Sequence, residues 1–390
     1  MIIQNTNWNF PTSIWFGPGR IKELVKACEH LGIQNPLFVT DEVLINLDIV
    51  KSTTELLRSG GIKFNMYSNV QGNPTGSNVT EGVDFYNVNE HDGVIAFGGG
   101  SALDAAKTIA LMSGQARSIW DFEDVGDNWS RADVNSIAPI IAIPTTAGTG
   151  SEVGRAAVIL DEEACSKKII FHPKMLPSLI ISDPELTLGL PSNITAWTGM
   201  DALVHAMEAY CAPGYHPMAD GIAIEAIRMI TKNLPIAVAD GQNLEARGQM
   251  LTASSMAAVA FQKGLGSIHS VAHQLGAIYN IQHGLVNSIL LPYGLKQNTL
   301  AIEERMVHLS IVLGLDTPGT STIINYILDL RNQLNIPHSL KEVDITSDRA
   351  KEVGEKAFKD PSTPTNAKPV NARDLENLFM AAFEGKLENL

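Results

Sequence analysis

Continuously apolar runs alternate with segments of helical spacing over the first half of the chain. The runs lie at 36–40, 93–100, 139–151 and 178–184, and a helical segment such as 101–112 (SALDAAKTIALM) follows a run. A run that is apolar at every position is typical of a strand buried on both faces, as in parallel sheets. This half therefore predicts an α/β fold in which helices cover both faces of a parallel sheet.

The pattern changes near residue 190. Apolar positions recur every three or four residues in 194–211 and 216–235, and strand signals are nearly absent from there on. We therefore expect an α/β N-terminal domain over 1–187 and an all-α C-terminal domain over 188–390. Residues 359–374 (KDPSTPTNAKPVNARD) are predicted to form the loosest loop.

Charge and cysteine content narrow the class of partner. The net charge is 28 − 42 = −14, which repels nucleic acid and anionic membrane surfaces and favours a small-molecule partner. The three cysteines are widely spaced and form no CxxC pair, which is typical of a cytoplasmic protein without a disulfide framework or a thiolate metal site. Residues 1–20 lack a basic region followed by an apolar run, so no signal peptide is expected.

Histidines gather where charged side chains are missing. Three of the ten histidines, His269, His273 and His283, lie in a stretch (264–295) that contains no Lys, Arg, Asp or Glu. The polar residues embedded in this stretch favour a buried segment over a membrane span. Upstream, Asp201 and His205 are four residues apart on a predicted helix, so they share one helix face, and His269 and His273 repeat this spacing.

A pair at this spacing can supply half of a metal site, because both side chains can reach one ion. A single such pair is more often an ordinary surface pair. This chain has two such pairs and a further histidine, and three of the histidines lie in an uncharged segment. This combination favours a metal centre. Because thiolates are absent, nitrogen and oxygen would bind the ion, which suits Fe²⁺, Zn²⁺, Mn²⁺ or Ni²⁺ without choosing among them.

Two glycine-rich loops follow predicted strands in the first half. Residues 96–110 (AFGGGSALDAAKTIA) place three glycines and a serine before a helix, and 144–151 (PTTAGTGS) add hydroxyl groups. Glycine lets a ligand approach the backbone, and a helix N-terminus presents free N–H groups to an anion. The spacing is not GxGxxG, and one such loop is as often a tight turn. Two of them at strand ends favour a nucleotide.

Asp41 stands at the end of the first apolar run. Its carboxylate is suited to the two ribose hydroxyls of NAD and would repel the 2′-phosphate of NADP. An aspartate at this place also serves as the N-cap of a following helix, and the two roles are compatible.

Four motifs together resemble the iron-containing (group III) alcohol dehydrogenases, which belong to the dehydroquinate synthase-like superfamily. They are GGGSALDAAK (98–107), PTTAGTGSEV (144–153), GMDALVHAMEAY (199–210) and HSVAHQLGAIYNIQHGLVNSILLPY (269–293). The resemblance implies a dinucleotide domain followed by a helical metal domain, with the active site between them. It also implies a cytoplasmic oxidoreductase that forms a dimer or a larger homo-oligomer.

The resemblance further implies individual site residues. The metal ligands would be Asp201, His205, His269 and His283, and His273 would be a catalytic neighbour of the metal and the nicotinamide. The NAD contacts would be Asp41, Asn73, Gly99, Gly100, Ser101, Asp104, Thr145, Thr146, Thr149, Lys167, Thr187 and Leu188. Lys168 is an equally available neighbour of Lys167.

The activity implied is hydride transfer between NAD and a short primary alcohol or aldehyde, with Fe²⁺, or Zn²⁺ or another divalent ion, as Lewis acid. Residues 260–266 (AFQKGLG) resemble members that act on 4-hydroxybutyrate, so Lys263 would pair with a terminal substrate carboxylate; the other interpretation is a solvated loop lysine. Gly72 and Gln274 stand where many members have proline. Three other functions stay open: a zinc-dependent glycerol or diol dehydrogenase, a non-catalytic nucleotide-binding sensor, and dehydroquinate synthase-like elimination, for which the motifs offer no basic pocket.

Overall fold

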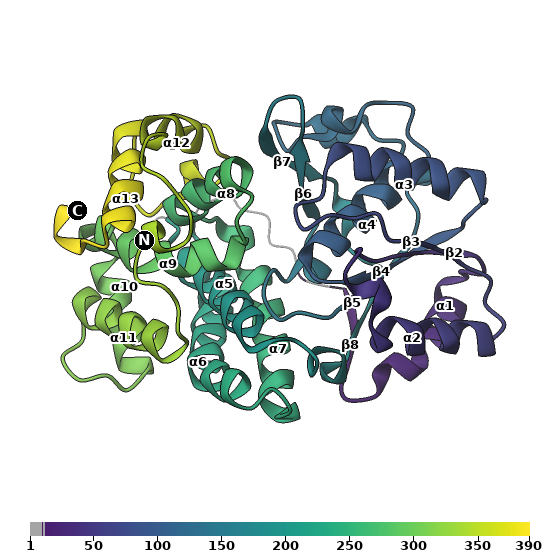
Figure 1. Cartoon of the computed structure of the whole chain (residues 1–390), viewed down its shortest axis with the longest axis horizontal. Coiled ribbons are helices and arrows are strands. Elements are labelled where there is room, and N and C mark those ends of the chain that lie inside the picture. Colours follow the sequence, from purple (N-terminus) through teal and green to yellow (C-terminus); the bar gives the residue numbers. More distant parts are fainter. Residues whose placement is uncertain (1–9, 11) are drawn as a thin grey trace. The chain divides into compact units, whose positions relative to one another are not determined.

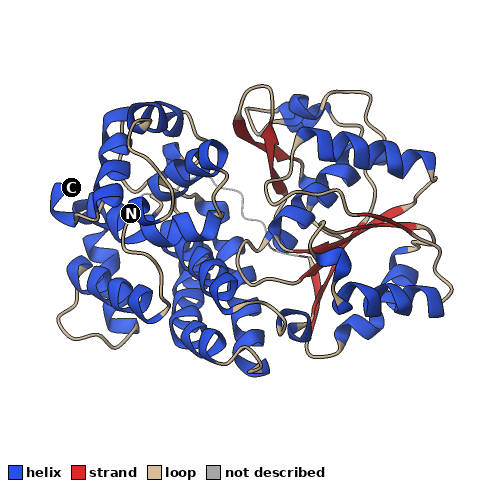
Figure 2. Ribbon diagram, in the orientation of Figure 1, coloured by secondary structure: helices blue, strands red, loops and turns tan. Residues whose placement is uncertain are grey.

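The computed structural model of the chain describes Phe10 and residues 12–390, which form two compact units (Figure 1). The units divide between Gly189 and Leu190. Strands lie in the first unit, and the second is built from helices (Figure 2). This change of architecture confirms the predicted fold class, an α/β part followed by an all-α part.

The N-terminal unit is built on a parallel six-stranded sheet with the strand order β1-β8-β5-β4-β2-β3. A separate antiparallel hairpin, β6-β7, accompanies it. The strands are β1 (Ser13–Phe16), β2 (Pro36–Val39), β3 (Asn65–Tyr67), β4 (Gly93–Gly98), β5 (Ile140–Pro144), β6 (Ala156–Asp161), β7 (Ser166–Phe171) and β8 (Leu179–Ser182). The helices are α1 (Leu24–Leu31), α2 (Asp48–Ser59), α3 (Gly76–Val88) and α4 (Gly100–Met112).

Both faces of the sheet are buried. Phe38, Ile95 and Ile141 pack in one apolar cluster with Leu24 of α1 and Leu57 of α2, and α3 and α4 lie on the other side of the sheet (Figure 1). Burial on both faces explains the continuous apolar runs of β2, β4, β5 and β8, and it confirms these four predicted strands. The pattern missed β1 and β3, which are short edge strands with exposed positions, and the hairpin, in which β6 alternates in burial.

The C-terminal unit is a bundle of helices. Helix α5 (Ser192–Cys211) packs against several others and is buried at nearly every position from Thr195 to Tyr210. The further helices are α6 (Pro217–Ala239), α7 (Leu244–Ala260), α8 (Ser267–Tyr279), α9 (His283–Gln297), α10 (Thr299–Val312), α11 (Thr320–Gln333), α12 (Ala350–Phe358) and α13 (Ala372–Glu384).

The charge-free stretch 264–295 forms α8 and all but the last two residues of α9, and it is buried over most of its length. Between the two helices the chain turns at Asn280, whose φ of 49° is left-handed. The stretch is therefore a buried segment, as predicted. Among the described residues, no helix is both long and apolar enough to cross a membrane.

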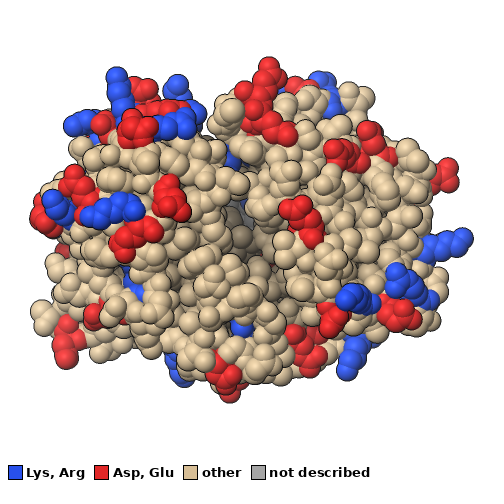
Figure 3. Space-filling model, in the orientation of Figure 1, with Lys and Arg blue, Asp and Glu red and all other residues tan. Residues whose placement is uncertain are grey.

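Acidic and basic side chains are interspersed on the face of the molecule drawn in Figure 3. Several charges pair within one helical turn, as Arg228 does with Glu225 (2.5 Å) and Arg349 with Glu352 (2.8 Å). Exposed pairs of this kind contribute at most about 1 kcal/mol each. Apolar burial within each unit, and not surface charge, is therefore the main source of its stability.

Candidate metal centre and nucleotide loops

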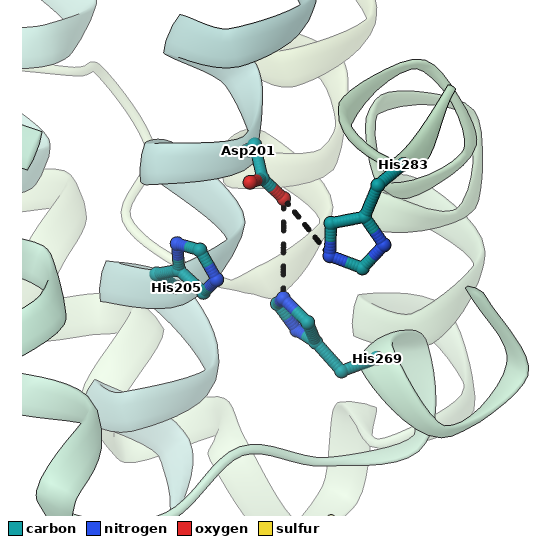
Figure 4. A group of neighbouring side chains, drawn as sticks. All are labelled: Asp201, His205, His269 and His283. Carbon is teal, nitrogen blue, oxygen red and sulfur yellow. Dashed lines mark ion pairs between the residues drawn. The ribbon is translucent and has the colours of Figure 1, made fainter. Parts of the chain in front are cut away.

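Four ligand-type side chains converge in the helical unit (Figure 4). Helix α5 supplies Asp201 and His205, α8 supplies His269, and His283 is the first residue of α9. One ligand atom from each residue lies within 4.8 Å of those of the other three. Asp201 Oδ1 is 3.9 Å from His269 Nε2 and 3.6 Å from His283 Nε2. The structure thus brings together the four residues that the sequence resemblance implies as metal ligands.

The cluster fits a divalent metal ion. Ligand atoms around one ion with bonds of about 2.1 Å lie roughly 3–4 Å apart, which is close to the spacing found here. Nδ1 of His205 is buried and has no hydrogen-bond partner among the described residues. Burial and the neighbouring His205 hold the pKa of His269 well below its usual range, so this imidazole is neutral and has a lone pair to offer.

A buried carboxylate, Glu208, orients His269. Glu208 Oε2 is 2.5 Å from His269 Nδ1, and Oε1 accepts the Ile268 N–H at 2.9 Å. The same carboxylate therefore caps the N-terminus of α8 and fixes the imidazole that this helix carries. Burial raises the pKa of Glu208 to about 7, although the N–H groups of Ile268 and His269 oppose the rise.

Asn287, on the first turns of α9, contacts three of the four ligand-type residues. Its Nδ2 donates to Asp201 Oδ1 at 2.7 Å, and it lies 3.2 Å from His269 Nε2 and 3.0 Å from His283 Nε2. Sequence reasoning missed both Glu208 and Asn287. Glu208 is seven residues after Asp201 and Asn287 is four after His283. Each therefore shares a helix face with a predicted ligand, and this spacing is the signal that could have found them.

His273 lies beside the cluster. Its ring centroid is 5.4 Å from that of His283 and 5.9 Å from that of His269. Its Nδ1 is 2.9 Å from Oδ2 of Asp360, a buried residue of the loop 359–371. Burial by itself would raise the pKa of Asp360, but His273 and the Ser362 N–H outweigh it and lower the pKa. The sequence does not point to Asp360, because it presents this segment only as a loose loop.

In the N-terminal unit, the two predicted glycine-rich loops meet where β4 and β5 end. The Thr145 N–H donates to the carbonyl of Gly98 at 3.0 Å. A Cβ on Gly100 would come within 2.5 Å of Thr149 Cγ2, so glycine is needed for this close approach. Helix α4 begins at Gly100, and no described side chain caps it. Its first N–H groups are therefore available to an anion such as a phosphate.

A third segment joins these loops. The Ser101 hydroxyl donates to the carbonyl of Gly72 at 2.6 Å. Asn73 is the residue that follows Gly72, so it lies next to this contact. The carboxyl ends of parallel strands are where α/β sheets bind ligands. Seven of the predicted cofactor residues lie on the three segments: Asn73, Gly99, Gly100, Ser101, Thr145, Thr146 and Thr149.

Asp41 follows β2 and caps the turn after it. Its Oδ1 accepts the N–H groups of Val43 at 2.9 Å and Leu44 at 2.8 Å, so Asp41 caps the turn that leads into the short helix Leu44–Asn46, whose N-cap position is Val43 and not Asp41 as predicted. Its other oxygen, Oδ2, is directed toward Gly98, where an added Cβ would lie 3.7 Å away. The capping contacts involve only Oδ1, so they are compatible with a ribose contact through Oδ2, and that contact stays a prediction.

Asp104 has contacts within the protein that the sequence does not reveal. Its carboxylate accepts the Ser151 hydroxyl at 2.5 Å and the Val158 N–H at 2.8 Å, and it pairs with the buried Lys107 at 3.3 Å. These contacts fasten α4 to the second glycine-rich loop and to β6. A direct contact of Asp104 with the nucleotide stays a prediction.

The remaining cofactor predictions fall on β7 and on the turn after β8. Lys168 pairs with Asp161 at 2.9 Å, so it is held within the hairpin. Lys167, which points to the other face of the strand, remains the candidate of the two. Thr187 is buried and donates its hydroxyl to a carbonyl in its own turn at 2.8 Å, whereas Leu188 is half-buried.

Two family models match most of the chain. The model described as "Iron-containing alcohol dehydrogenase" matches residues 11–184, and "Fe-containing alcohol dehydrogenase family, C-terminal" matches residues 195–383. The chain belongs to the iron-containing alcohol dehydrogenase family. This membership confirms the resemblance carried by the four sequence motifs, and it makes the chain an oxidoreductase of the alcohol dehydrogenase type.

Similar members of the family are named for different alcohols. The NAD-dependent methanol dehydrogenase of Bacillus methanolicus is 34% identical over 97% of this chain and 100% of its own length. The 4-hydroxybutyrate dehydrogenase of Cupriavidus necator is 34% identical over 94% of this chain and 97% of its own length. The crystal structure of a 1,3-propanediol oxidoreductase matches with a TM-score of 0.92 and 34% identity, covering 97% of this chain and 100% of that chain. Overall similarity therefore does not select one substrate.

The surroundings of Lys263 contradict both interpretations offered by the sequence. Its side chain is 1% exposed, forms an ion pair with Asp220, and donates to the carbonyl of Tyr210 at 3.2 Å. Asp220 also pairs with Arg305 at 3.2 Å. Lys263 is therefore neither a solvated loop lysine nor a free cation awaiting a substrate carboxylate. Its ion pair with Asp220 links the short helix 261–263 to α6.

Proposed function

We propose that the protein is an NAD-dependent alcohol dehydrogenase that interconverts short primary alcohols and aldehydes, with Fe²⁺ held by Asp201, His205, His269 and His283. The observation that carries this proposal is the convergence of four nitrogen and oxygen ligands from three helices to within 4.8 Å of one another. Membership of the iron-containing family supports iron as the metal.

A bound divalent ion supplies Lewis acidity toward the oxygen of the alcohol or the carbonyl group. The chain's own residues prepare the place for it. Asp201 is the one anionic ligand, and Glu208 keeps the proton of His269 on Nδ1, which leaves Nε2 for the ion. The buried stretch 264–295 of α8 and α9 brings no Lys, Arg, Asp or Glu of its own to the site. Its burial makes electrostatic interactions at the substrate oxygen stronger than in water.

His273 is the proposed acid–base residue. A further ligand at the ion would occupy the position that the substrate oxygen needs, which argues for His273 as a neighbour and not a ligand. Asp360 engages Nδ1 of His273 at 2.9 Å, so Nε2 is left to take or give the proton of the alcohol. Acid–base assistance of this kind contributes about 10²–10⁴-fold to the rate.

NAD binding is proposed at the glycine-rich loops of the N-terminal unit. The NAD-dependent relative from Bacillus methanolicus supports the choice of dinucleotide, and Asp41 supports NAD over NADP because a carboxylate repels a 2′-phosphate. A dinucleotide held there would supply the nicotinamide ring that exchanges the hydride with the substrate. The proposed contacts are Asp41, Asn73, Gly99, Gly100, Ser101, Asp104, Thr145, Thr146, Thr149, Lys167, Thr187 and Leu188.

The proposed substrates include ω-hydroxy acids, because a relative is named for 4-hydroxybutyrate, but Lys263 is not their carboxylate partner. Replacing Lys263 with Met is expected to leave the ratio of kcat/KM values for 4-hydroxybutyrate and butanol unchanged. A loss of activity confined to the acid would restore Lys263 as the partner of the substrate carboxylate.

We also propose that the enzyme works in the cytoplasm as a dimer or a larger homo-oligomer. Cys28, Cys165 and Cys211 are all free, which supports a reducing compartment. Light scattering of the purified protein measures the oligomer size, and a monomer at all concentrations would reject this part of the proposal.

The function is tested by NADH oxidation with enzyme purified without oxygen and assayed for metals. Metal-stripped protein is reloaded with Fe²⁺ or Zn²⁺ and offered butanal, succinic semialdehyde, 3-hydroxypropanal and dihydroxyacetone. Activity toward the aldehydes is expected with Fe²⁺. Activity with Zn²⁺ alone and a preference for dihydroxyacetone would indicate a glycerol dehydrogenase instead. Metal-loaded protein that oxidises NADH with none of these compounds would overturn the proposal.

A further inference from the structure

The loop 359–371, between α12 and α13, is fastened along helix α8. The Thr363 hydroxyl donates to Ser270 Oγ at 2.7 Å. Farther along the loop, Asn366 Oδ1 accepts the Ser267 N–H at 3.0 Å. The loop therefore runs along α8 in the reverse direction and contacts it at successive turns. These contacts hold the loop against the helix that carries His269 and His273.

Asp360 makes the contact of this loop that reaches His273. Its Oδ2 accepts from His273 Nδ1 at 2.9 Å and from Gln274 Nε2 at 3.3 Å, and its Oδ1 accepts the Ser362 N–H at 2.9 Å. The side chains of Asp360 and His273 are 3% and 8% exposed. Both carboxylate oxygens are thus engaged in a buried place, so the carboxylate has one orientation relative to the imidazole.

We propose that Asp360 is a positioning residue for His273, which it holds in the tautomer and orientation needed for proton exchange with the alcohol. This inference rests on the proposed role of His273 as the acid–base residue. An ionised carboxylate only accepts hydrogen bonds, so it keeps the imidazole hydrogen on Nδ1. Nε2 is then the atom left for proton exchange. The same carboxylate fixes the plane of the His273 ring. This ring is stacked on that of His283, with 5.4 Å between the two ring centroids.

A structural role is the rival explanation, because Asp360 also anchors the loop. A double-mutant cycle in kcat separates the two roles, since a residue that acts through His273 has no effect once His273 is gone. The four proteins are the wild type, Asp360→Ala, His273→Ala and the double variant. Metal content and NADH binding are measured for each protein beside kcat and KM.

Asp360→Ala is expected to lower kcat about 10- to 100-fold, as removal of a residue that orients a functional histidine typically does, with metal content unchanged. In the His273→Ala background the same substitution is expected to change kcat less than about twofold. An equal fall in both backgrounds, or no fall in the wild-type background, would overturn the inference. Asp360→Asn, which has nearly the same shape, replaces Asp360→Ala in the cycle if the alanine variant does not fold.

Thr363→Val is the matched control. It removes the buried contacts of the Thr363 hydroxyl with Ser270 on the same helix and with the Ala357 carbonyl of α12, without touching His273. We expect it to lower the melting temperature at least as much as Asp360→Asn and to leave kcat near the wild-type value. A fall in kcat equal to that of Asp360→Ala would show that loosening the loop is the cause.

The two hypotheses fail in distinguishable ways. If His273→Ala keeps full turnover, the proposed role of His273 is wrong and the inference falls with it. If His273→Ala lowers kcat while Asp360→Ala does not, the proposed function stands and the inference alone is wrong.

Discussion

The two candidate sites of this chain are built in opposite ways. In the N-terminal unit, the loops after β4 and β5 offer backbone N–H groups and small side chains, and Gly100 allows them to approach. In the C-terminal unit, side chains from three helices converge, and the buried Glu208 and Asn287 hold them in place. A larger side chain at a glycine is expected to disrupt a site formed by closely packed backbone. Truncation of a ligand or of the residue that orients it is expected to disrupt a site formed by side chains. Substitutions chosen by this rule should therefore separate NAD binding from metal binding.

The largest effect is expected from removing a metal ligand. His269→Ala or His283→Ala should lose the metal, and with it a contribution of several kcal/mol to catalysis, so turnover should fall by about 10³-fold or more. His273→Ala should keep the metal and lower turnover by about 10²–10⁴-fold. Metal analysis by mass spectrometry beside steady-state kinetics checks both expectations.

The surface variant His30→Ala is the control, because His30 is exposed and lies in the N-terminal unit. It should keep both metal and activity. If His273→Ala protein loses its metal as readily as His269→Ala protein does, the division between ligands and neighbour is wrong.

A smaller effect is expected from the carboxylate that orients His269. Glu208→Gln keeps the shape of the side chain but replaces the carboxyl group, whose Oε2 lies 2.5 Å from His269 Nδ1, with an amide that cannot ionise. Metal affinity should fall about 10- to 100-fold, while NAD binding stays unchanged. Competition with a chelator measures the affinity. Glu225→Gln, on the exposed face of α6, is the matched control and should change neither quantity.

Local pattern in the sequence predicted the central strands and pointed to the buried segment that carries three of the histidines. The four central strands have continuous apolar runs because both faces of the sheet are buried. The charge-free stretch with three histidines drew attention to the segment that carries two of the four ligand-type residues, since a buried segment rarely keeps polar side chains without a use. The edge strands β1 and β3 lacked this signal because part of each strand is exposed.

Contacts between distant segments could not be predicted in this way. Asp360 is 87 residues from His273 in the chain, and no periodic pattern links a loop to a helix at such a separation. The burial of Lys263 depends on Asp220, which is 43 residues away, so the sequence alone indicates only a loop lysine or a partner of a substrate carboxylate. Tertiary packing decides both cases.

NAD binding at the glycine-rich loops of the N-terminal unit should respond to a single added methyl group. The Cβ of Gly100→Ala would meet Thr149 Cγ2 at 2.5 Å, which forces the two loops apart. Overpacking of this kind costs about 1–3 kcal/mol, so the KM for NAD should rise roughly 5- to 150-fold with metal content unchanged. Adding Thr149→Ala should restore part of the affinity. Gly221→Ala on α6, where an added Cβ meets no atom within 4 Å, should have no effect.

The smallest effect is expected where one charge selects between two dinucleotides. Asp41 is only half-buried, and two like charges about 4 Å apart in a watery environment repel by about 1 kcal/mol. Asp41→Gly should therefore improve the kcat/KM ratio of NADP to NAD by roughly fivefold. Because Gly also removes the cap on Val43 and Leu44, Asp41→Asn is the better-matched variant, since its amide oxygen can accept the same N–H groups without the charge. Equal gains from both variants would assign the effect to charge, and a gain with Gly alone would assign it to the loosened turn. A wild-type enzyme that already prefers NADP would show that Asp41 does not face the ribose.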